Sequence, residues 1–162
     1  MNDKKGLWLN LGCGDDILDG FINIDKEFSA EDHMKHRGKL WVCNLEAAWP
    51  PLDGTVDYVL AKDIIEHLPD KIHTMNEAHR ILKNGGIFEI HVPTTDGTGA
   101  FQDPTHVSFW NRRSFLYYEH GNIYRDRFAK SYGVKAAFKV VSESVMETMD
   151  GPRLTIILEA VK

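Results

Sequence analysis

The chain has 162 residues, of which 43% are hydrophobic and 27% charged, and its formal net charge is −5. This length allows one sizeable core but not two ordinary domains, so we expect a single domain over residues 1–162. The acidic balance argues against recruitment to nucleic acid or an anionic membrane through an overall basic field.

Cysteine usage and hydropathy bear on the compartment. Cys13 and Cys43 lie in apolar, strand-like segments without CxxC spacing, which favours a reduced cytosolic chain over a disulfide framework. The first residues lack a signal-type apolar region, and no apolar run approaches the length of a membrane span. We therefore expect a cytoplasmic protein with no membrane partner.

Short β-rich runs alternate with polar or helical stretches, a pattern typical of a mostly parallel sheet covered by helices. The predicted strands are Leu7–Leu11, Phe21–Asp25, Lys39–Cys43, Val56–Ala61, Gly86–Val92, Lys135–Ser144 and Arg153–Val161. A turn signal at residues 149–152 makes the last two strands antiparallel.

A helix is predicted to begin at Asp70 and Lys71 and to be stopped by residues 84–86, Asn-Gly-Gly. Its apolar face consists of Ile72, Met75, Ala78, Ile81 and Leu82.

The first predicted strand runs into Gly12 and Gly14, and the second ends on Asp25. Glycine lets the backbone pass close under a ligand, and a carboxylate at the tip of the neighbouring strand can accept both hydroxyl hydrogens of a ribose. This pairing indicates an adenosine-bearing cofactor, although a tight turn beside a solvated aspartate would give the same pattern.

The fourth and fifth predicted strands also end in polar segments, at Asp63 and at residues 96–99. Open α/β sheets place their ligands at the carboxyl ends of the strands. Three strand ends are therefore expected to meet at one crevice.

Several segments, taken together in this order, resemble a class I S-adenosylmethionine-dependent methyltransferase of the small stand-alone type. They are Asn10–Gly14, Asn23–Asp25, Glu66–Leu68, Arg80–Gly86 and Asp103–Val107. The resemblance implies a Rossmann-like, doubly wound α/β sheet of seven strands in the order 3-2-1-4-5-7-6, with strand 7 antiparallel and helices on both faces. It also implies S-adenosyl-L-methionine as the cofactor and S-adenosyl-L-homocysteine as the product.

The resemblance further implies which residues hold the cofactor. They are Leu11, Gly12, Cys13, Gly14, Asp25, Lys26, Asn44, Leu45, Ala61 and Lys62. The glycine loop would pass beneath the methionine part, Asp25 would bind the ribose hydroxyls, and the backbone at Ala61 and Lys62 would line the methionine end. Asn44 replaces an aspartate that faces adenine, and its amide oxygen can still accept from the exocyclic amine.

One alternative is a nucleotide-binding oxidoreductase. Only ten residues separate Gly14 from Asp25, and Ile17 occupies the third glycine position of a dinucleotide fingerprint. An NAD fold expects a full crossover helix with its acidic residue about 20 positions on. The short crossover therefore argues against NAD.

Residues from about 97 to 134 are predicted to form a cap or lid between the fifth and sixth strands. They combine many aromatic residues with several arginines. One interpretation is a packed helical cap with solvated arginines, and the other is a lid that excludes water and contacts the acceptor. Asn111 is a predicted helix N-cap, so Phe115 and Tyr118 should share one face.

Methyl transfer from a sulfonium needs mainly alignment of the acceptor, and a base only where the acceptor must lose a proton. The predicted catalytic residues are His106, Asp63 and His67. We expect Asp103 to orient the ring of His106. For both histidines, the alternative is a structural role in fixing a loop.

No metal is expected, because the metal ligands that the sequence suggests have irregular spacing. Those ligands are His91, Asp96, Asp103 and His106.

The sequence therefore predicts an enzyme that methylates an oxygen or nitrogen of a small polar acceptor. Methylation of RNA or protein is the alternative that the arginines and aromatic residues of the insert support. A cofactor-binding module without catalysis is the alternative from outside the enzymes. The oligomeric state stays open.

Overall fold

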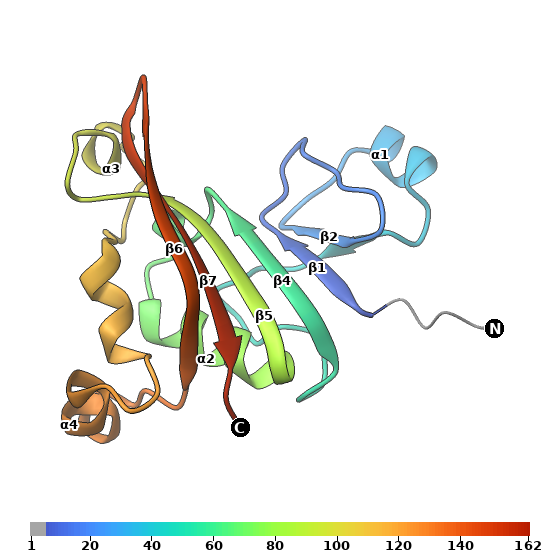
Figure 1. The fold of residues 1–162 in the computed structure, drawn as a ribbon. Coiled ribbons are helices and arrows are strands. Elements are labelled where there is room, and N and C mark those ends of the chain that lie inside the picture. The colour runs from blue at the N-terminus through green and yellow to red at the C-terminus, as the bar shows by residue number, and fades with distance from the viewer. Residues whose placement is uncertain (1–5) are drawn as a thin grey trace.

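The computed structural model describes residues 6–162, which form one seven-stranded sheet in the order β3-β2-β1-β4-β5-β7-β6 (Figure 1). Strand β7 runs antiparallel to both of its neighbours. The strands are β1 (Trp8–Leu11), β2 (Ile22–Asp25), β3 (Leu40–Val42), β4 (Val56–Lys62), β5 (Leu82–Pro93), β6 (Phe138–Thr148) and β7 (Gly151–Ala160). The predicted strand order and the antiparallel last strand are confirmed.

Short helices connect these strands. They are α1 (Ala30–Lys35), α2 (Lys71–Ile81), α3 (Gly99–Gln102) and α4 (Ile123–Tyr132), with 3-10 helices η1 (Ile65–His67) and η2 (Arg112–Tyr117). In the described part of the chain, every helix is too short or too polar to cross a bilayer.

The sequence predicts the start of helix α2 correctly but not its end. The Asp70 carboxylate accepts a hydrogen bond from the His73 amide at 2.9 Å, which caps the first turn. The prediction that residues 84–86 stop the helix is wrong. The helix ends at Ile81, because Leu82 is extended and already pairs with Val56 in the sheet. The strand therefore begins without an intervening turn.

The connection between β1 and β2 contains no helix and is held by two buried asparagines. Asn10 donates to the Asn23 side chain at 3.0 Å and to the Asp16 carbonyl at 2.8 Å. Asn23 in turn exchanges hydrogen bonds with both backbone groups of Leu18, at 2.9 and 3.1 Å. Because buried amides are costly unless paired, this network fixes the path of the short crossover that carries the glycine loop.

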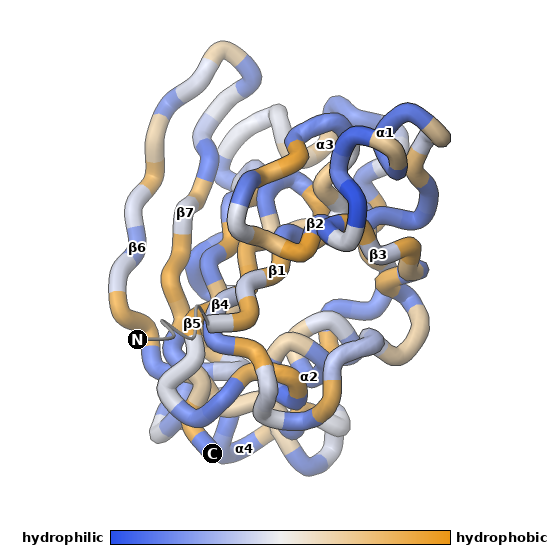
Figure 2. Tube along the Cα trace, turned by 90° about the vertical axis from the view of Figure 1, so that its right-hand side faces the viewer, coloured by the Kyte–Doolittle hydropathy of each residue, from blue (hydrophilic) through white to orange (hydrophobic). Residues whose placement is uncertain are grey.

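Hydrophobic side chains of the central strands form the core. Leu9, Val59, Phe88 and Ile156 are all buried within one cluster, to which α2 contributes Met75. Helix α1, by contrast, is mostly hydrophilic (Figure 2) and buries no residue. The sheet and α2 therefore supply the rigid frame, and α1 lies on its surface.

The insert runs from α3 down to α4 beside the β6–β7 hairpin (Figure 1). Phe115 and Tyr118 are both buried, as their predicted common face requires, and Phe115 stacks on Trp110 with 5.2 Å between ring centroids. Tyr117 and Phe128 pack against each other nearer the surface. The second half of the insert thus has its own aromatic packing.

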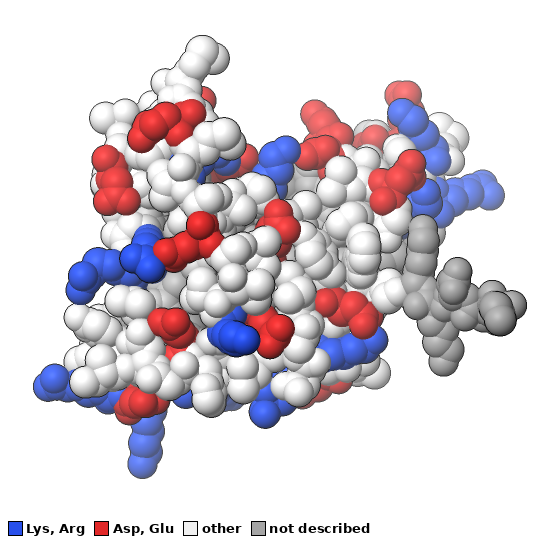
Figure 3. All heavy atoms as spheres, viewed as in Figure 1, with Lys and Arg blue, Asp and Glu red and all other residues white. Residues whose placement is uncertain are grey.

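Charged residues of both signs are interspersed on the face shown in Figure 3. This mixed pattern agrees with the weakly acidic composition, and that face carries no extended basic patch.

Candidate functional site

A cavity of about 400 Å³ lies at the carboxyl ends of β1 and β2. It is lined by Gly12, Asp25, Lys26, Cys43, Asn44, Leu45, Glu46, Ile64, His67, Leu68 and Thr105. Half of the predicted cofactor residues are in this set. Carboxylate, amide and aliphatic side chains meet here, which suits a ligand with a sugar and an apolar ring.

Backbone conformation and available space explain the glycines at positions 12 and 14. Gly12 has a φ of +57°, and a Cβ at this position would lie 2.3 Å from Cγ1 of Ile64. Gly14 has a φ of +49°, but a Cβ at this position would meet no atom within 4 Å. Gly12 is therefore required by both conformation and space, and Gly14 by conformation.

Asp25 is held by the backbone of the loop beside it. Its Oδ2 accepts from the Gly14 amide at 2.8 Å, and its Oδ1 accepts from the Lys26 amide at 2.7 Å. A carboxylate has about four acceptor positions, so these bonds fix its orientation and leave others free. The arrangement fits the two hydroxyls of a ribose.

The other predicted cofactor residues do not line this cavity. Leu11 and Ala61 are buried beneath it in the core, and the buried Cys13 thiol has its pKa raised to about 12 by desolvation. Lys62 forms an ion pair with Asp16 at 3.0 Å. Their backbone remains adjacent to Gly12 and to the end of β4.

Sequence reasoning missed several lining residues, of which Ile64 and Leu68 flank the Glu66-His67 segment. The positive φ of Gly12 was readable from the motif, but its contact with Ile64 was not. Asn44 uses its side-chain oxygen to accept from the Glu46 amide at 3.0 Å, which holds the loop after β3.

A second, smaller cavity of about 200 Å³ adjoins the first. It is lined by Asp63, Glu66, His67, Pro93, Gly99, Gln102, Asp103, His106, Asp150 and Arg153. The structure therefore brings all three predicted catalytic residues together. His67 lines both cavities, so the two are neighbours.

Asp63 stands at the end of β4 in an unusual conformation. Its φ is +54°, and it is the non-glycine residue with positive φ among residues 6–162. Its amide donates to the His91 carbonyl at 3.0 Å, and its carboxylate forms an ion pair with Arg153 of β7. Such backbone strain persists where surrounding contacts enforce it, often at functional sites.

Both histidines are oriented through Nδ1. The His106 Nδ1 lies 3.0 Å from the Ala100 carbonyl, and the His67 Nδ1 lies 3.1 Å from the Thr105 hydroxyl oxygen. The expectation that Asp103 orients His106 is wrong. Asp103 instead accepts from the amide and hydroxyl of Thr105, at 2.8 and 2.6 Å, and so shapes the loop.

Glu66 is the main functional candidate that sequence reasoning missed. The residue is 2% exposed, and its Oε2 has no hydrogen-bond partner in the part of the chain that is described. Burial raises the pKa of this carboxyl to about 7. Its backbone carbonyl accepts from the amides of Val107 and Ser108, each at 2.9 Å, which joins η1 to the insert.

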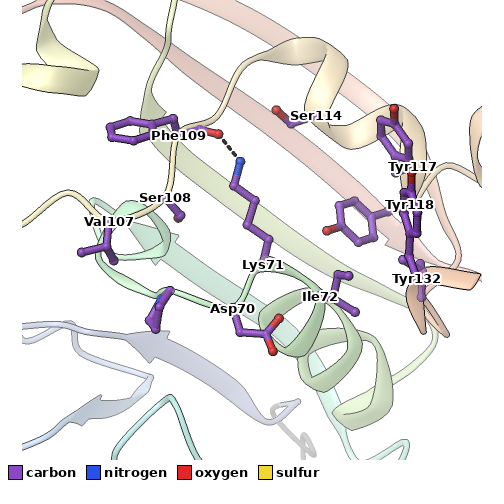
Figure 4. A pocket seen from close by; sticks show the side chains of 12 residues that line it. Asp70, Lys71, Ile72, Val107, Ser108, Phe109, Ser114, Tyr117, Tyr118 and Tyr132 are labelled. Carbon is purple, nitrogen blue, oxygen red and sulfur yellow. Dashed lines mark hydrogen bonds between the residues drawn. The ribbon is translucent and has the colours of Figure 1, made fainter.

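A larger cavity, of about 810 Å³, lies between α2 and the insert (Figure 4). Lys71 reaches across it, donates to the Phe109 carbonyl and lies 4.6 Å from the centroid of the Trp110 ring. Its walls include Tyr117 and Tyr132. None of the predicted site residues lines this cavity.

Comparison with known proteins gives matches to methyltransferases. The model of a family described as "Methyltransferase domain" matches residues 1–143. A protein of Mycolicibacterium smegmatis described as a "Probable S-adenosylmethionine-dependent methyltransferase" is 30% identical over 95 residues, which cover 52% of this chain. The matched part is only 37% of that protein, well under two thirds of its length.

Two solved structures share the fold. The first is a complex of the Haloferax volcanii Trm112 methyltransferase activator with a putative methyltransferase, with a TM-score of 0.68 at 18% identity, covering 98% of this chain and 84% of that one. The second is the Burkholderia thailandensis 1,6-didemethyltoxoflavin-N1-methyltransferase, which holds S-adenosylhomocysteine. Its TM-score is 0.63 at 11% identity, covering 96% of this chain and 71% of that one.

Proposed function

Because the chain belongs to the methyltransferase domain family, we propose that it transfers a methyl group from S-adenosyl-L-methionine to an oxygen or nitrogen of a small polar acceptor. The product would be S-adenosyl-L-homocysteine. The observation that carries this proposal is the pair of adjoining cavities that share His67. One suits the cofactor, and the other holds the groups that suit an acceptor.

On the cofactor side, Asp25 would bind the ribose hydroxyls with the acceptor positions that Gly14 and Lys26 leave free. Leu45 would face the adenine beside Asn44, and both line the first cavity. The cofactor supplies a methyl group on a sulfonium, which already carries a good leaving group. The chain's own task is then to place the acceptor in line and exclude water.

On the acceptor side, His106, His67 and Asp63 would contact or position the acceptor in the second cavity. His106 is the group placed to take a proton, because Nδ1 donates to a carbonyl and leaves a lone pair on Nε2. Asp63 is held by Arg153, so we assign it a positioning role.

We further propose that residues 1–162 act as one domain and that the first part of the insert, residues 97–106, caps the acceptor. Gly99 and His106 from this part line the second cavity. The second part, residues 107–134, has its own aromatic packing between η2 and α4 and lines the separate cavity beside α2. A cavity of about 200 Å³ favours a small acceptor over RNA or a protein, which remain the alternatives.

The proposal is tested by incubating the protein with isotopically labelled S-adenosyl-L-methionine and a panel of small acceptors, and following product masses. We expect label in a small hydroxyl or amine compound, and loss of that signal in Asp25→Ala. Asp19→Ala is the matched control, because Asp19 is exposed and pairs with Lys39.

Label that appears only on RNA or protein would contradict the small acceptor. Tight binding of S-adenosylhomocysteine with no transfer to any acceptor class would instead identify a cofactor-binding module without catalysis.

A further inference from the structure

Three potential metal ligands meet in the second cavity. Glu66, His67 and His106 each offer one ligand atom, and these atoms lie within 4.8 Å of one another. The ring centroids of the two histidines are 4.9 Å apart, and the rings meet at an interplanar angle of 75°. The residues come from η1 and from the insert, which the Glu66 backbone joins.

The histidine hydrogen bonds favour ligation through Nε2. In both rings Nδ1 faces an oxygen, the Ala100 carbonyl for His106 and the Thr105 carbonyl and hydroxyl for His67. The Thr105 hydroxyl already donates to Asp103, so the His67 Nδ1 is the donor in its own contacts. Metal-binding histidines are typically held in this way, with one nitrogen donating to oxygen and the other free.

Glu66 is the observation that points to a ligand. Burying a carboxylate oxygen without a partner is expensive, and Oε2 of Glu66 is such an oxygen among residues 6–162. In the metal-bound protein Nε2 of His106 would be a ligand, so the proton-accepting role proposed above would apply only to the metal-free protein. Asp103 and Asp150 line the same cavity and make its surroundings acidic, and the one arginine there, Arg153, is paired with Asp63.

We propose that Glu66, His67 and His106 bind one divalent transition-metal ion, of which Zn²⁺ is the natural probe. Two imidazoles and one carboxylate are a common ligand set of zinc sites that keep a position open. A tetrahedral ion holds its ligand atoms about 3.3 Å apart, so small side-chain rotations would close the present spacing. Because His67 also lines the first cavity, the open position would serve an acceptor oxygen or nitrogen; that consequence alone rests on the proposed function.

The test is a titration of the whole protein with zinc chloride, followed by calorimetry and by metal analysis after dialysis. We expect one Zn²⁺ per chain in the parent. Glu66→Gln and His106→Ala should each weaken Zn²⁺ binding at least tenfold, since even the outer partners of metal ligands matter by about 10- to 100-fold. His33→Ala is the control, because His33 is exposed on α1 and should leave Zn²⁺ binding unchanged.

The proposal is overturned if the parent binds no Zn²⁺ saturably, or if Glu66→Gln and His106→Ala both bind it as the parent does. Each variant is also titrated with S-adenosylhomocysteine, which reports folding and the first cavity separately. Retained S-adenosylhomocysteine binding without Zn²⁺ binding would overturn the metal site and leave the methyltransferase proposal intact.

Discussion

At the scale of single residues, the two glycines of the loop offer a matched comparison. Both have positive φ, but a Cβ would overlap the Ile64 side chain only at Gly12. Gly14→Ala should cost about 1–2 kcal/mol of unfolding free energy, the usual cost of the left-handed conformation. Gly12→Ala should cost roughly 1–3 kcal/mol more, because Ile64 must move. Urea unfolding without cofactor measures both.

The same loop separates folding from binding. A Gly14→Val variant has open space for its side chain within the protein, so it should remain folded. Its side chain would occupy the space over the loop, so thermal stabilisation by S-adenosylhomocysteine should disappear. Equal destabilisation by alanine at the two glycines would contradict the steric role of Ile64. A full thermal shift in Gly14→Val would contradict binding of the cofactor over the loop.

Site residues were predictable from the sequence where they belong to a short, continuous motif. The glycine loop, Asp25 and His67 follow from short patterns, and Gly12, Asp25 and His67 line the cavities. The Asp63–Arg153 ion pair and the buried oxygen of Glu66 did not follow, because each depends on segments far apart in the chain. The correct partner of His106, Ala100, is a backbone carbonyl that no side-chain pattern reveals.

At the scale of elements, α2 is tied to the loop before β4 by Glu77 and Arg80. Glu77 accepts from the Trp49 amide at 2.7 Å and from two nitrogens of Arg80, at 2.8 and 2.7 Å. Arg80 also donates to the carbonyls of Trp49 and Pro51, each at 2.9 Å. These charge-assisted bonds hold the pKa of Glu77 below its usual value.

Glu77→Gln should therefore lower the unfolding free energy at pH 7 by about 1.5–3 kcal/mol, the range for hydrogen bonds to a charged group. A depressed carboxyl pKa stabilises the fold above its unfolded value of about 4.3 and loses that contribution as the pH falls through the folded value. Denaturant unfolding of parent and variant should converge at acidic pH. A difference that persists unchanged below the folded pKa of Glu77 would refute the ionic origin.

Element boundaries were harder to predict than the elements themselves. Short β-rich runs made every strand predictable, but α2 passes directly into β5 because Leu82 pairs with Val56. The glycines at 85 and 86 look like a helix stop and instead lie inside a strand. Tertiary pairing outweighed the local signal. The absence of a helix between β1 and β2 was foreseen only as a length limit, and the Asn10–Asn23 pair explains how the crossover manages without one.

At the scale of the whole molecule, the order of the strands decides the site. The parallel strands β1 to β5 bring their carboxyl ends to one edge, so the loops after all five contribute to the two cavities, together with the β6–β7 turn. This convergence was predictable, because it follows from the parallel pattern alone. Within the insert, residues between 99 and 106 line the second cavity and residues between 107 and 134 line the cavity beside α2. This division was not predictable, since aromatic residues occur throughout the insert.

A ligand that binds only the folded chain stabilises the whole molecule, which gives a global test of the cofactor. At a free concentration about 100 times its dissociation constant, S-adenosylhomocysteine should add about 2.7 kcal/mol to the unfolding free energy. For a chain of this size that corresponds to a rise of roughly 5–10 °C in melting temperature. NAD at the same concentration should give no shift, because the crossover between Gly14 and Asp25 has no helix to present to a pyrophosphate. Differential scanning calorimetry with each ligand decides the matter, and stabilisation by NAD instead would point to the oxidoreductase alternative.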